Sequence, residues 1–331
     1  YPNLKTFSGA LFGQIDWAIT EKLHLLPGIR VNYDDKSVDF KRVTYGGLET
    51  TDPALIAIKN SVYSNQEFQA QIDSMNLSGQ LTLSYKATGK VNTYATFATN
   101  FKPVGLNLGG LPSVGGKPLT ELAVIKPEEL QHFEIGIKTS PTNATTANLT
   151  IYNTNIKNFQ TQVQLADLSV NRGFLANAEE VRVRGVEFDG NARIGDYISL
   201  YGAVAYTDGI YVKFTNAPPP LEETGGPTFK DISGSELPGI SKWAGSLGGE
   251  VSQPGKLFNL DGKYFLALDT YYRSSFSSSG SPSKYLVIDG YGLLNARIGF
   301  QNHGFTAYVW GRNLLNTNYY EQLLPAGGNA G

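Results

Sequence analysis

Histidine, the commonest metal ligand and acid–base group, is scarce in this sequence. The chain has three, which are His24, His132 and His303. None has a second histidine at the i, i+4 spacing of a zinc-binding helix, and the chain has no cysteine. Neither a GxxxxGK(S/T) phosphate loop nor a G-x-S-x-G nucleophile elbow is present. The sequence therefore predicts no metal site, no cofactor and no enzyme activity.

Adjacent carboxylates are the other residues with possible chemistry. They stand at Asp34-Asp35, Glu128-Glu129 and Glu222-Glu223. Calcium binding and general acid–base catalysis both use such pairs. Neighbouring side chains on an extended strand point to opposite faces, so these pairs are not arranged to share a task. We expect them to be solvated loop charges.

Composition separates this chain from ordinary soluble domains and from helical membrane proteins. Charged residues make up 17%, against about a quarter in typical globular domains, while Gly (37) and Tyr (19) are abundant. No stretch approaches the roughly 18 consecutive apolar residues that a membrane-spanning helix needs. The net charge of −2 gives no case for nucleic-acid binding. Because the first residues form no signal peptide, we expect a mature or partial segment of an exported protein.

Strict alternation between Met75 and Thr88 predicts a strand with two different faces. Apolar side chains occupy odd positions and are expected to face lipid: Leu77, Leu81, Leu83 and Tyr85. Polar side chains occupy even positions and are expected to face a lumen: Gln80, Thr82, Ser84 and Lys86. A similar strand follows the Gly89-Lys90 turn, so the two strands form a hairpin.

Short turns alternate with long loops along the whole chain. Tight turns are predicted near Thr20-Glu21, Gly89-Lys90, Pro141-Thr142-Asn143, Gly195-Asp196, Gln253-Pro254-Gly255 and Asn302-His303-Gly304. Long Gly/Pro-rich connections are predicted at residues 41–73, 102–127, 165–178, 215–238 and 277–283. This asymmetry, with about twelve long strands, is typical of outer-membrane barrels and not of soluble sandwiches or propellers. The predicted fold is all-β, a transmembrane antiparallel β-barrel, with residues 1–331 forming a single partial barrel domain.

Four short motifs lie in order on the predicted strands. They read YATFATNFKP at residues 94–103, KPEE at 126–129 ahead of FEIGIK, RGVE at 184–187, and GRNLLN at 311–316 ahead of Tyr319-Tyr320. In this order and spacing they resemble the C-terminal half of TonB-dependent outer-membrane receptors. The resemblance implies a 22-stranded barrel whose lumen is closed by a plug. This chain would supply roughly strands ten to twenty-one, without the plug, the early strands or the last strand. Alone, it is expected neither to close a barrel nor to transport.

The resemblance also implies a function, a location and partners. The protein is expected in the bacterial outer membrane, importing a scarce nutrient, with a ferric siderophore as the first expectation. Energy would come from TonB and its inner-membrane complex through the plug. A glycan importer with a lipoprotein lid and a passive porin-like channel remain as alternatives. Aromatic and basic loop residues are the candidate contacts for an anionic ferric chelate: Arg42, Tyr45, Tyr63, Lys117, Arg172, Phe174 and Lys230.

The alternation changes phase near Gly185. Charged residues occupy even positions before this glycine and odd positions after it. A β-bulge within residues 184–186 would restore a single face, because one extra residue shifts the phase by one. The bulge predicts one charged stripe in the lumen, facing the plug: Arg182, Arg184, Glu187, Asp189 and Arg193.

Overall fold

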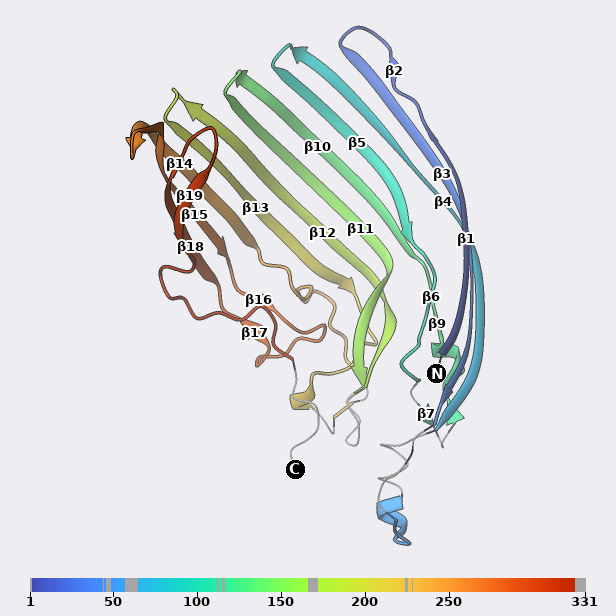
Figure 1. The fold of residues 1–331 in the computed structure, drawn as a ribbon. Coiled ribbons are helices and arrows are strands. Elements are labelled where there is room, and N and C mark those ends of the chain that lie inside the picture. The colour runs from blue at the N-terminus through green and yellow to red at the C-terminus, as the bar shows by residue number, and fades with distance from the viewer. Residues whose placement is uncertain are drawn as a thin grey trace.

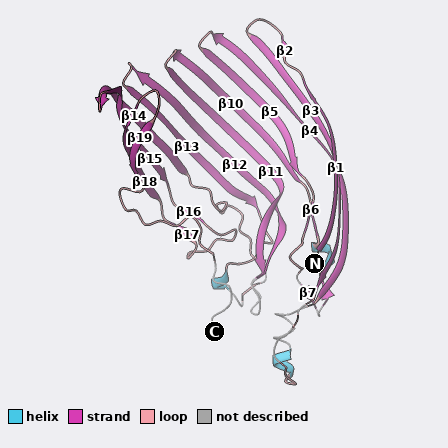
Figure 2. Cartoon of the chain, in the orientation of Figure 1, coloured by secondary structure: helices cyan, strands magenta, loops and turns pink. Residues whose placement is uncertain are grey.

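A single curved antiparallel sheet dominates the structure (Figures 1 and 2). A computed structural model describes residues 2–324, apart from residues 44, 46–48, 57–64, 112, 115–116, 166–171, 224–225 and 228. The sheet has 13 strands, and twelve follow in the order β1-β3-β4-β5-β10-β11-β12-β13-β14-β15-β18-β19. The thirteenth, β2 (Trp17–Ala18), pairs with β3 beyond the end of β1. Within these described ranges no helix is long and apolar enough to cross a membrane.

Most strands of this path are long enough to cross a bilayer when tilted. They are β1 (Pro2–Gln14), β3 (Leu23–Arg42), β4 (Gln66–Thr88), β5 (Val91–Lys102), β10 (Glu128–Thr142), β11 (Thr145–Leu165), β12 (Arg172–Ile194), β13 (Ile198–Lys213), β14 (Trp243–Leu257), β15 (Leu260–Arg273), β18 (Tyr291–Gln301) and β19 (Thr306–Gly311). The long connections hold β6 (Gly105–Leu106), β7 (Ser113–Val114), β8 (Lys117–Pro118), β9 (Val124–Ile125), β16 (Phe276–Ser277), β17 (Val287–Ile288) and the 3-10 turns η1 (Thr120–Leu122) and η2 (Leu221–Glu223).

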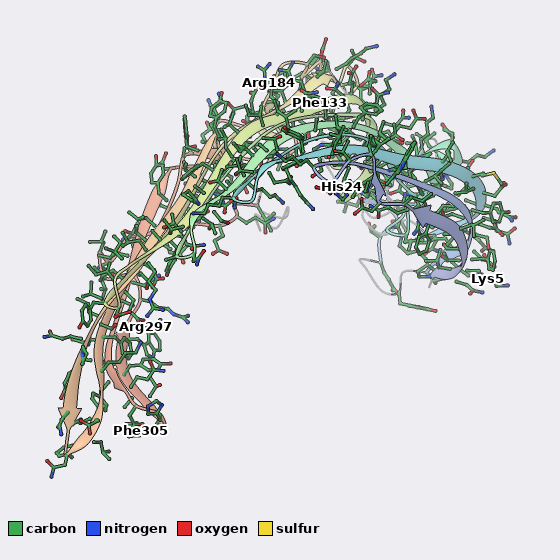
Figure 3. The ribbon with its side chains drawn as sticks, turned by 90° about the horizontal axis from the view of Figure 1, so that it is seen from above. Lys5, His24, Phe133, Arg184, Arg297 and Phe305 are labelled. Atoms are coloured by element: carbon green, nitrogen blue, oxygen red, sulfur yellow. The ribbon has the colours of Figure 1, made fainter. Side chains whose placement is uncertain are left out.

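The sheet is an open arc when seen from above (Figure 3). In the described part of the chain, β1 and β19 are its two edges and do not pair with each other. The all-β prediction is therefore confirmed, and the wall has the curvature of a barrel without closure. The 22-stranded whole with its plug stays a prediction.

Short turns lie along one rim and long connections at the other end (Figure 1). One predicted turn is wrong, because β14 continues through Gln253-Pro254-Gly255, and the chain reverses at Phe258 and Asn259, which have φ of 46° and 69°. Such positive φ at both central residues matches a tight type I′ hairpin turn. Pro254 is tolerated in the strand because β13 stops pairing at Val251, which leaves that edge without a neighbour.

The two faces of β4 differ in polarity as the alternation predicts. Leu77 is 67% exposed on the convex face, with Leu81, Leu83 and Tyr85 beside it. On the other face, Thr82 bonds Thr96 at 2.8 Å. Ser84 on that face is paired with His24, which Figure 3 places inside the arc. The segregation of side chains is confirmed.

Tyrosines on the concave face lie over glycines of the next strand. Tyr94, Tyr152 and Tyr201 are paired with Gly136, Gly185 and Gly248. A Cβ at Gly136 would lie 2.5 Å from the Tyr94 ring, and one at Gly248 would lie 2.4 Å from the Tyr201 ring. The missing side chains of these glycines therefore leave room for the tyrosine rings to pack against the backbone, as in aromatic rescue of strand glycines.

The bulge predicted at Gly185 is wrong. Pairing of β12 with β11 and β13 continues without a shift through Gly185, and the only irregularity with β13 falls between Glu180 and Val181. Gly185 is needed for a different reason, since a Cβ there would meet the Tyr152 hydroxyl at 2.7 Å and the Tyr206 carbonyl at 2.4 Å.

The predicted single charged stripe is therefore divided between the two faces. Regular alternation sends Arg182 and Arg184 to the convex face, where Figure 3 shows Arg184. Glu187, Asp189 and Arg193 have the opposite parity and belong to the concave face. These last three are the ones that can still meet an occupant of the arc.

Replacing Gly185 with alanine should destabilise the fold by about 1–3 kcal/mol, the usual cost of overpacking. Gly13→Ala is the matched control, because no atom lies within 4 Å of a Cβ at that position. Urea titration of the complete protein that carries this chain, followed by heat-modifiable gel mobility, measures the unfolding midpoint. Equal midpoints for the two variants would contradict the close packing of Tyr152 on Gly185.

Candidate functional site: a loop-covered concave wall

The long connections fold back onto the concave face at the loop end. The described residues of the connection 103–127 cover β3 and β4, where buried Val38, Phe40 and Phe68 pack against Leu106 and Leu111. The described residues of the connection 214–242 cover β12 and β13 in a second cluster that includes Val181, Tyr211, Phe214, Ile232 and Leu237. A third cluster joins Phe276, Ile288 and Tyr291. By strand alternation, five of these side chains belong to the concave face: Val38, Phe40, Val181, Tyr211 and Tyr291. The clusters therefore reduce the open space inside the arc at the loop end.

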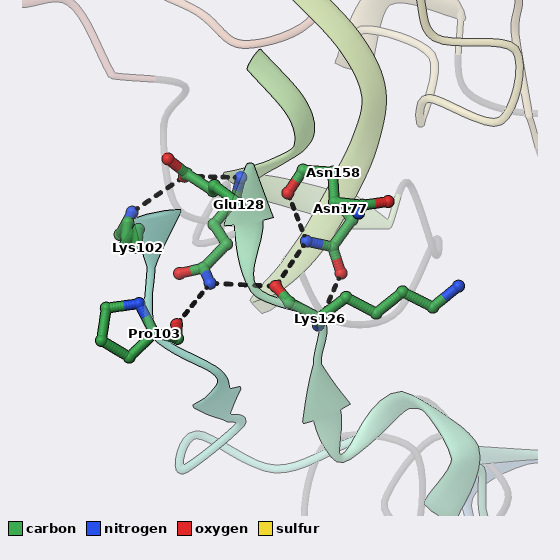
Figure 4. A network of polar contacts seen from close by, with 7 residues as sticks. Lys102, Pro103, Lys126, Glu128, Asn158 and Asn177 are labelled. Carbon is green, nitrogen blue, oxygen red and sulfur yellow. Dashed lines mark hydrogen bonds and ion pairs between the residues drawn. The ribbon is translucent and has the colours of Figure 1, made fainter. Parts of the chain in front are cut away.

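Amide side chains tie residues 103–127 to β11 and β12 (Figure 4). Gln160 donates from Nε2 to the carbonyls of Pro103 (2.8 Å) and Lys126 (3.0 Å). Asn177 accepts the Lys126 N–H at 3.0 Å and donates to the Asn158 carbonyl at 2.6 Å. Because these bonds reach backbone atoms, they fix the path of the connection whatever side chains it carries.

A second set of amides holds the same connection closer to its tip. Asn107 donates to the carbonyls of Leu122 (2.6 Å) and Leu175 (3.0 Å) and accepts the Leu175 N–H at 2.8 Å. Buried Gln66 donates to the Leu111 carbonyl at 2.6 Å and accepts its N–H at 2.9 Å. Residues 103–111 and 122–127 are thus a fixed part of the wall.

A carboxylate joins the other two loop clusters. Glu222 accepts the Ser283 hydroxyl at 3.1 Å and the Lys284 N–H at 3.2 Å. Burial opposes ionisation of Glu222, but these bonds and the Lys284 charge outweigh it and lower the pKa of that carboxyl. Glu222 is exposed, as predicted, and it also holds two connections together. The prediction of solvated loop charge is wrong for Asp34 and Glu128, which are 2% and 5% exposed within β3 and β10.

Four of the predicted ligand residues lie at this end but not all beside one another: Arg42, Tyr45, Lys117 and Lys230. Arg42 ends β3 and reaches the Gly109 carbonyl at 3.4 Å, so it adjoins the connection that carries exposed Lys117. Tyr45 is 88% exposed beyond β3. Lys230 lies in the separate cluster of residues 214–242 and pairs with Glu223 at 2.5 Å.

Three predicted ligand residues are not placed by side chain. Arg172 and Phe174 begin β12, and their side chains lie outside the described residues. Tyr63 lies wholly outside them. Ligand contact by any of the seven stays a prediction.

An acidic and tyrosine-rich band crosses the concave wall nearer the short turns. The Tyr94 hydroxyl donates to Glu134 Oε1 at 2.6 Å, and His132 Nε2 lies 3.4 Å from the other carboxylate oxygen. On the next strands the Tyr152 hydroxyl contacts Thr207 (3.3 Å) and Glu187. Glu134 and Glu187 therefore present carboxylates to the interior of the arc.

A cavity of about 390 Å³ opens beside this band. Its lining is mostly polar: Asp16, His24, Leu26, Thr82, Ser84, Lys86, Asn92, Tyr94, Thr96, Glu134 and Lys138. In the part of the chain that the structure describes, no three His, Asp or Glu are grouped to hold a metal ion. Glu134 has no predicted role, although its even position in FEIGIK places it on the same face as His132 and Lys138.

Asn107→Ala should release residues 103–127 from the wall. It removes the part-buried hydrogen bond from the Leu175 N–H and the two bonds that Asn107 donates, each typically worth about 0.5–1.5 kcal/mol. Limited proteolysis should then cut this connection faster than in the unmodified protein. Asn148→Ala is the control, since Asn148 bonds only the exposed Asp189. Unchanged cleavage in Asn107→Ala would show that these amide bonds do not fix the connection.

Comparison with known proteins identifies one family. The family model described as "TonB dependent receptor-like, beta-barrel" matches residues 1–314. A curated relative is a probable TonB-dependent siderophore receptor, PiuA, from Acinetobacter baumannii. It is 29% identical over 188 residues, which cover 54% of this chain and 23% of the relative.

Solved structures show the same fold. The ferric yersiniabactin uptake receptor FyuA of Yersinia pestis superposes with a TM-score of 0.74 at 17% identity, over 98% of this chain and 43% of that one. The closed form of the ferric-catecholate import receptor Fiu of E. coli K12 gives 0.66 at 18% identity, over 97% of this chain and 42% of that one. The chain thus spans less than half of each of these proteins.

Proposed function

Since the chain belongs to the TonB-dependent receptor-like β-barrel family, we propose that it forms part of the wall of a bacterial outer-membrane importer for a ferric siderophore. The observation that carries this proposal is the different polarity of the two faces of the sheet. The convex face is apolar and the concave face is polar, and anchored connections cover the concave face at the loop end. This is the asymmetry of an outer-membrane barrel, with short periplasmic turns and long extracellular loops. Relatives that import ferric siderophores support the choice of substrate.

In this placement the convex side chains of β4 face hydrocarbon. Leu81→Arg should then cost about 2–4 kcal/mol if Leu81 lies near the bilayer midplane, whereas Thr82→Arg on the concave face should be mild. Folding into lipid vesicles under a urea series measures both values. Similar costs at the two positions would contradict the proposed membrane placement.

A plug inside the arc would meet the acidic band. Glu134 on β10 and Glu187 on β12 lie on either side of β11 with their carboxylates toward the interior, and Asp189 and Arg193 continue the concave face of β12. Cationic groups of a plug would form charge-assisted hydrogen bonds there, each typically about 1.5–3 kcal/mol. TonB and its inner-membrane complex would act on the wall only through that plug.

Removing both carboxylates with Glu134→Gln and Glu187→Gln should lower ferric siderophore uptake, because the plug loses its charged contacts. Glu129→Gln is the control, since Glu129 alternates to the convex face of the same strand. Uptake of radioactive iron and the amount of folded receptor are measured together. If the double variant takes up as much iron as Glu129→Gln, the two carboxylates do not contribute to a plug interface, and this part of the proposal is wrong.

The function itself is tested with the complete protein that carries this chain. Cells that lack their own siderophore receptors express it, with and without TonB, and are given a panel of ferric siderophores. We expect uptake of at least one chelate only when TonB is present. TonB-independent entry would favour the porin-like alternative, and uptake of a glycan with no ferric chelate would favour the glycan importer.

A further inference from the structure

Two arginines of the convex face lie where its apolar band ends. One row of paired residues across neighbouring strands is apolar or aromatic: Ile151, Val186, Tyr206 and Trp243. The next row toward the loops is polar: Asn153, Arg184 and Asp208. A single step along the strands therefore leads from the band to charged side chains, and Figure 3 shows Arg184 pointing outward.

The charges of this row are unbalanced. Asp208 Oδ2 accepts from Arg184 Nε at 3.0 Å and from Arg182 Nη2 at 3.4 Å, so one carboxylate serves two guanidinium groups. Asp208 is 15% exposed, while Arg184 is 56% exposed. Arg182 Nε is buried with no acceptor among the described residues, so it is not itself open to a ligand. Asp208 offsets one of the two guanidinium charges, and the exposed guanidinium of Arg184 supplies the accessible donors.

We propose that Arg182 and Arg184 bind the phosphorylated head group of a membrane lipid. The planar guanidinium fork matches phosphate oxygens, and the row of Val186 and Tyr206 beneath it offers apolar surface to acyl chains. Trp243 packs on Tyr206 with ring centroids 5.0 Å apart, and both rings are of the type that settles at a membrane interface. A soluble anion would use the arginines alone, whereas a lipid uses both rows.

This inference rests on the membrane placement proposed above, and it is tested by direct binding rather than by uptake. The complete protein is purified in detergent, and phosphorylated lipid A in mixed micelles is the probe. The double variant Arg182→Gln/Arg184→Gln should bind it about 10-fold more weakly. Dephosphorylated lipid A should bind both proteins equally, and inorganic phosphate should bind neither.

Asp208→Asn removes the carboxylate that competes for the two arginines, so it should tighten binding of phosphorylated lipid A by about threefold. A misfolded variant would not gain affinity, so this result separates a binding effect from misfolding. Lys256→Gln removes a positive charge near the hairpin tip between β14 and β15, where Lys256 pairs with Asp261, and should change nothing.

Four outcomes would overturn the inference. They are equal binding by the double variant, weaker binding by Asp208→Asn, an equal loss in Lys256→Gln, or binding of inorganic phosphate as tight as that of the lipid. Loss of siderophore uptake with lipid binding intact would count against the proposed function only.

Discussion

The antiparallel ladder that runs from β1 to β19 constrains the rest of this structure. It pairs the backbone groups of each inner strand on both sides wherever both neighbouring strands reach. In hydrocarbon every unpaired group would cost several kcal/mol. The same ladder sends successive side chains to opposite faces, so each strand contributes equally to an apolar outside and a polar inside. A binding site must therefore use side chains of a single face, either the concave or the convex one, or residues beyond the strand ends.

The concave face is built from side chains that need space and partners of their own. Tyrosine rings lie over paired glycines. The Tyr94 hydroxyl reaches Glu134 on the adjoining strand, and those of Tyr152 and Tyr201 reach Thr207 and Asp269 across one intervening strand. Toward the loop end, apolar clusters and amide bonds to backbone atoms replace the tyrosines. The concave face thus changes along the strands from a polar band, where the proposed plug would sit, to an end covered by anchored connections.

The sequence predicts the strands and their faces well, because alternation is a local property and is clean in residues 75–88. It misplaces two features. Pro254 and Gly255 resemble a turn, but their strand lacks a neighbour on one side, which only the pairing reveals. The change of phase at Gly185 resembles a bulge, yet it marks the depth at which the convex face leaves the apolar band and accepts Arg184. The anchoring of residues 103–127 by Asn107 and Asn177 depends on contacts distant in sequence, which no local pattern shows.

The central claim is that one face of each strand meets lipid and the other does not. A spin-label scan of the complete protein that carries this chain tests it directly. This chain has no cysteine, so single cysteines from Met75 to Thr88 are labelled after any cysteine elsewhere in the protein has been replaced by serine. In lipid vesicles, collisions with oxygen and with a water-soluble nickel complex are measured at each position. The account predicts a period of two, with oxygen favoured at odd positions such as Leu81 and nickel at even positions such as Thr82. A profile without alternation, or with the opposite phase, would contradict it.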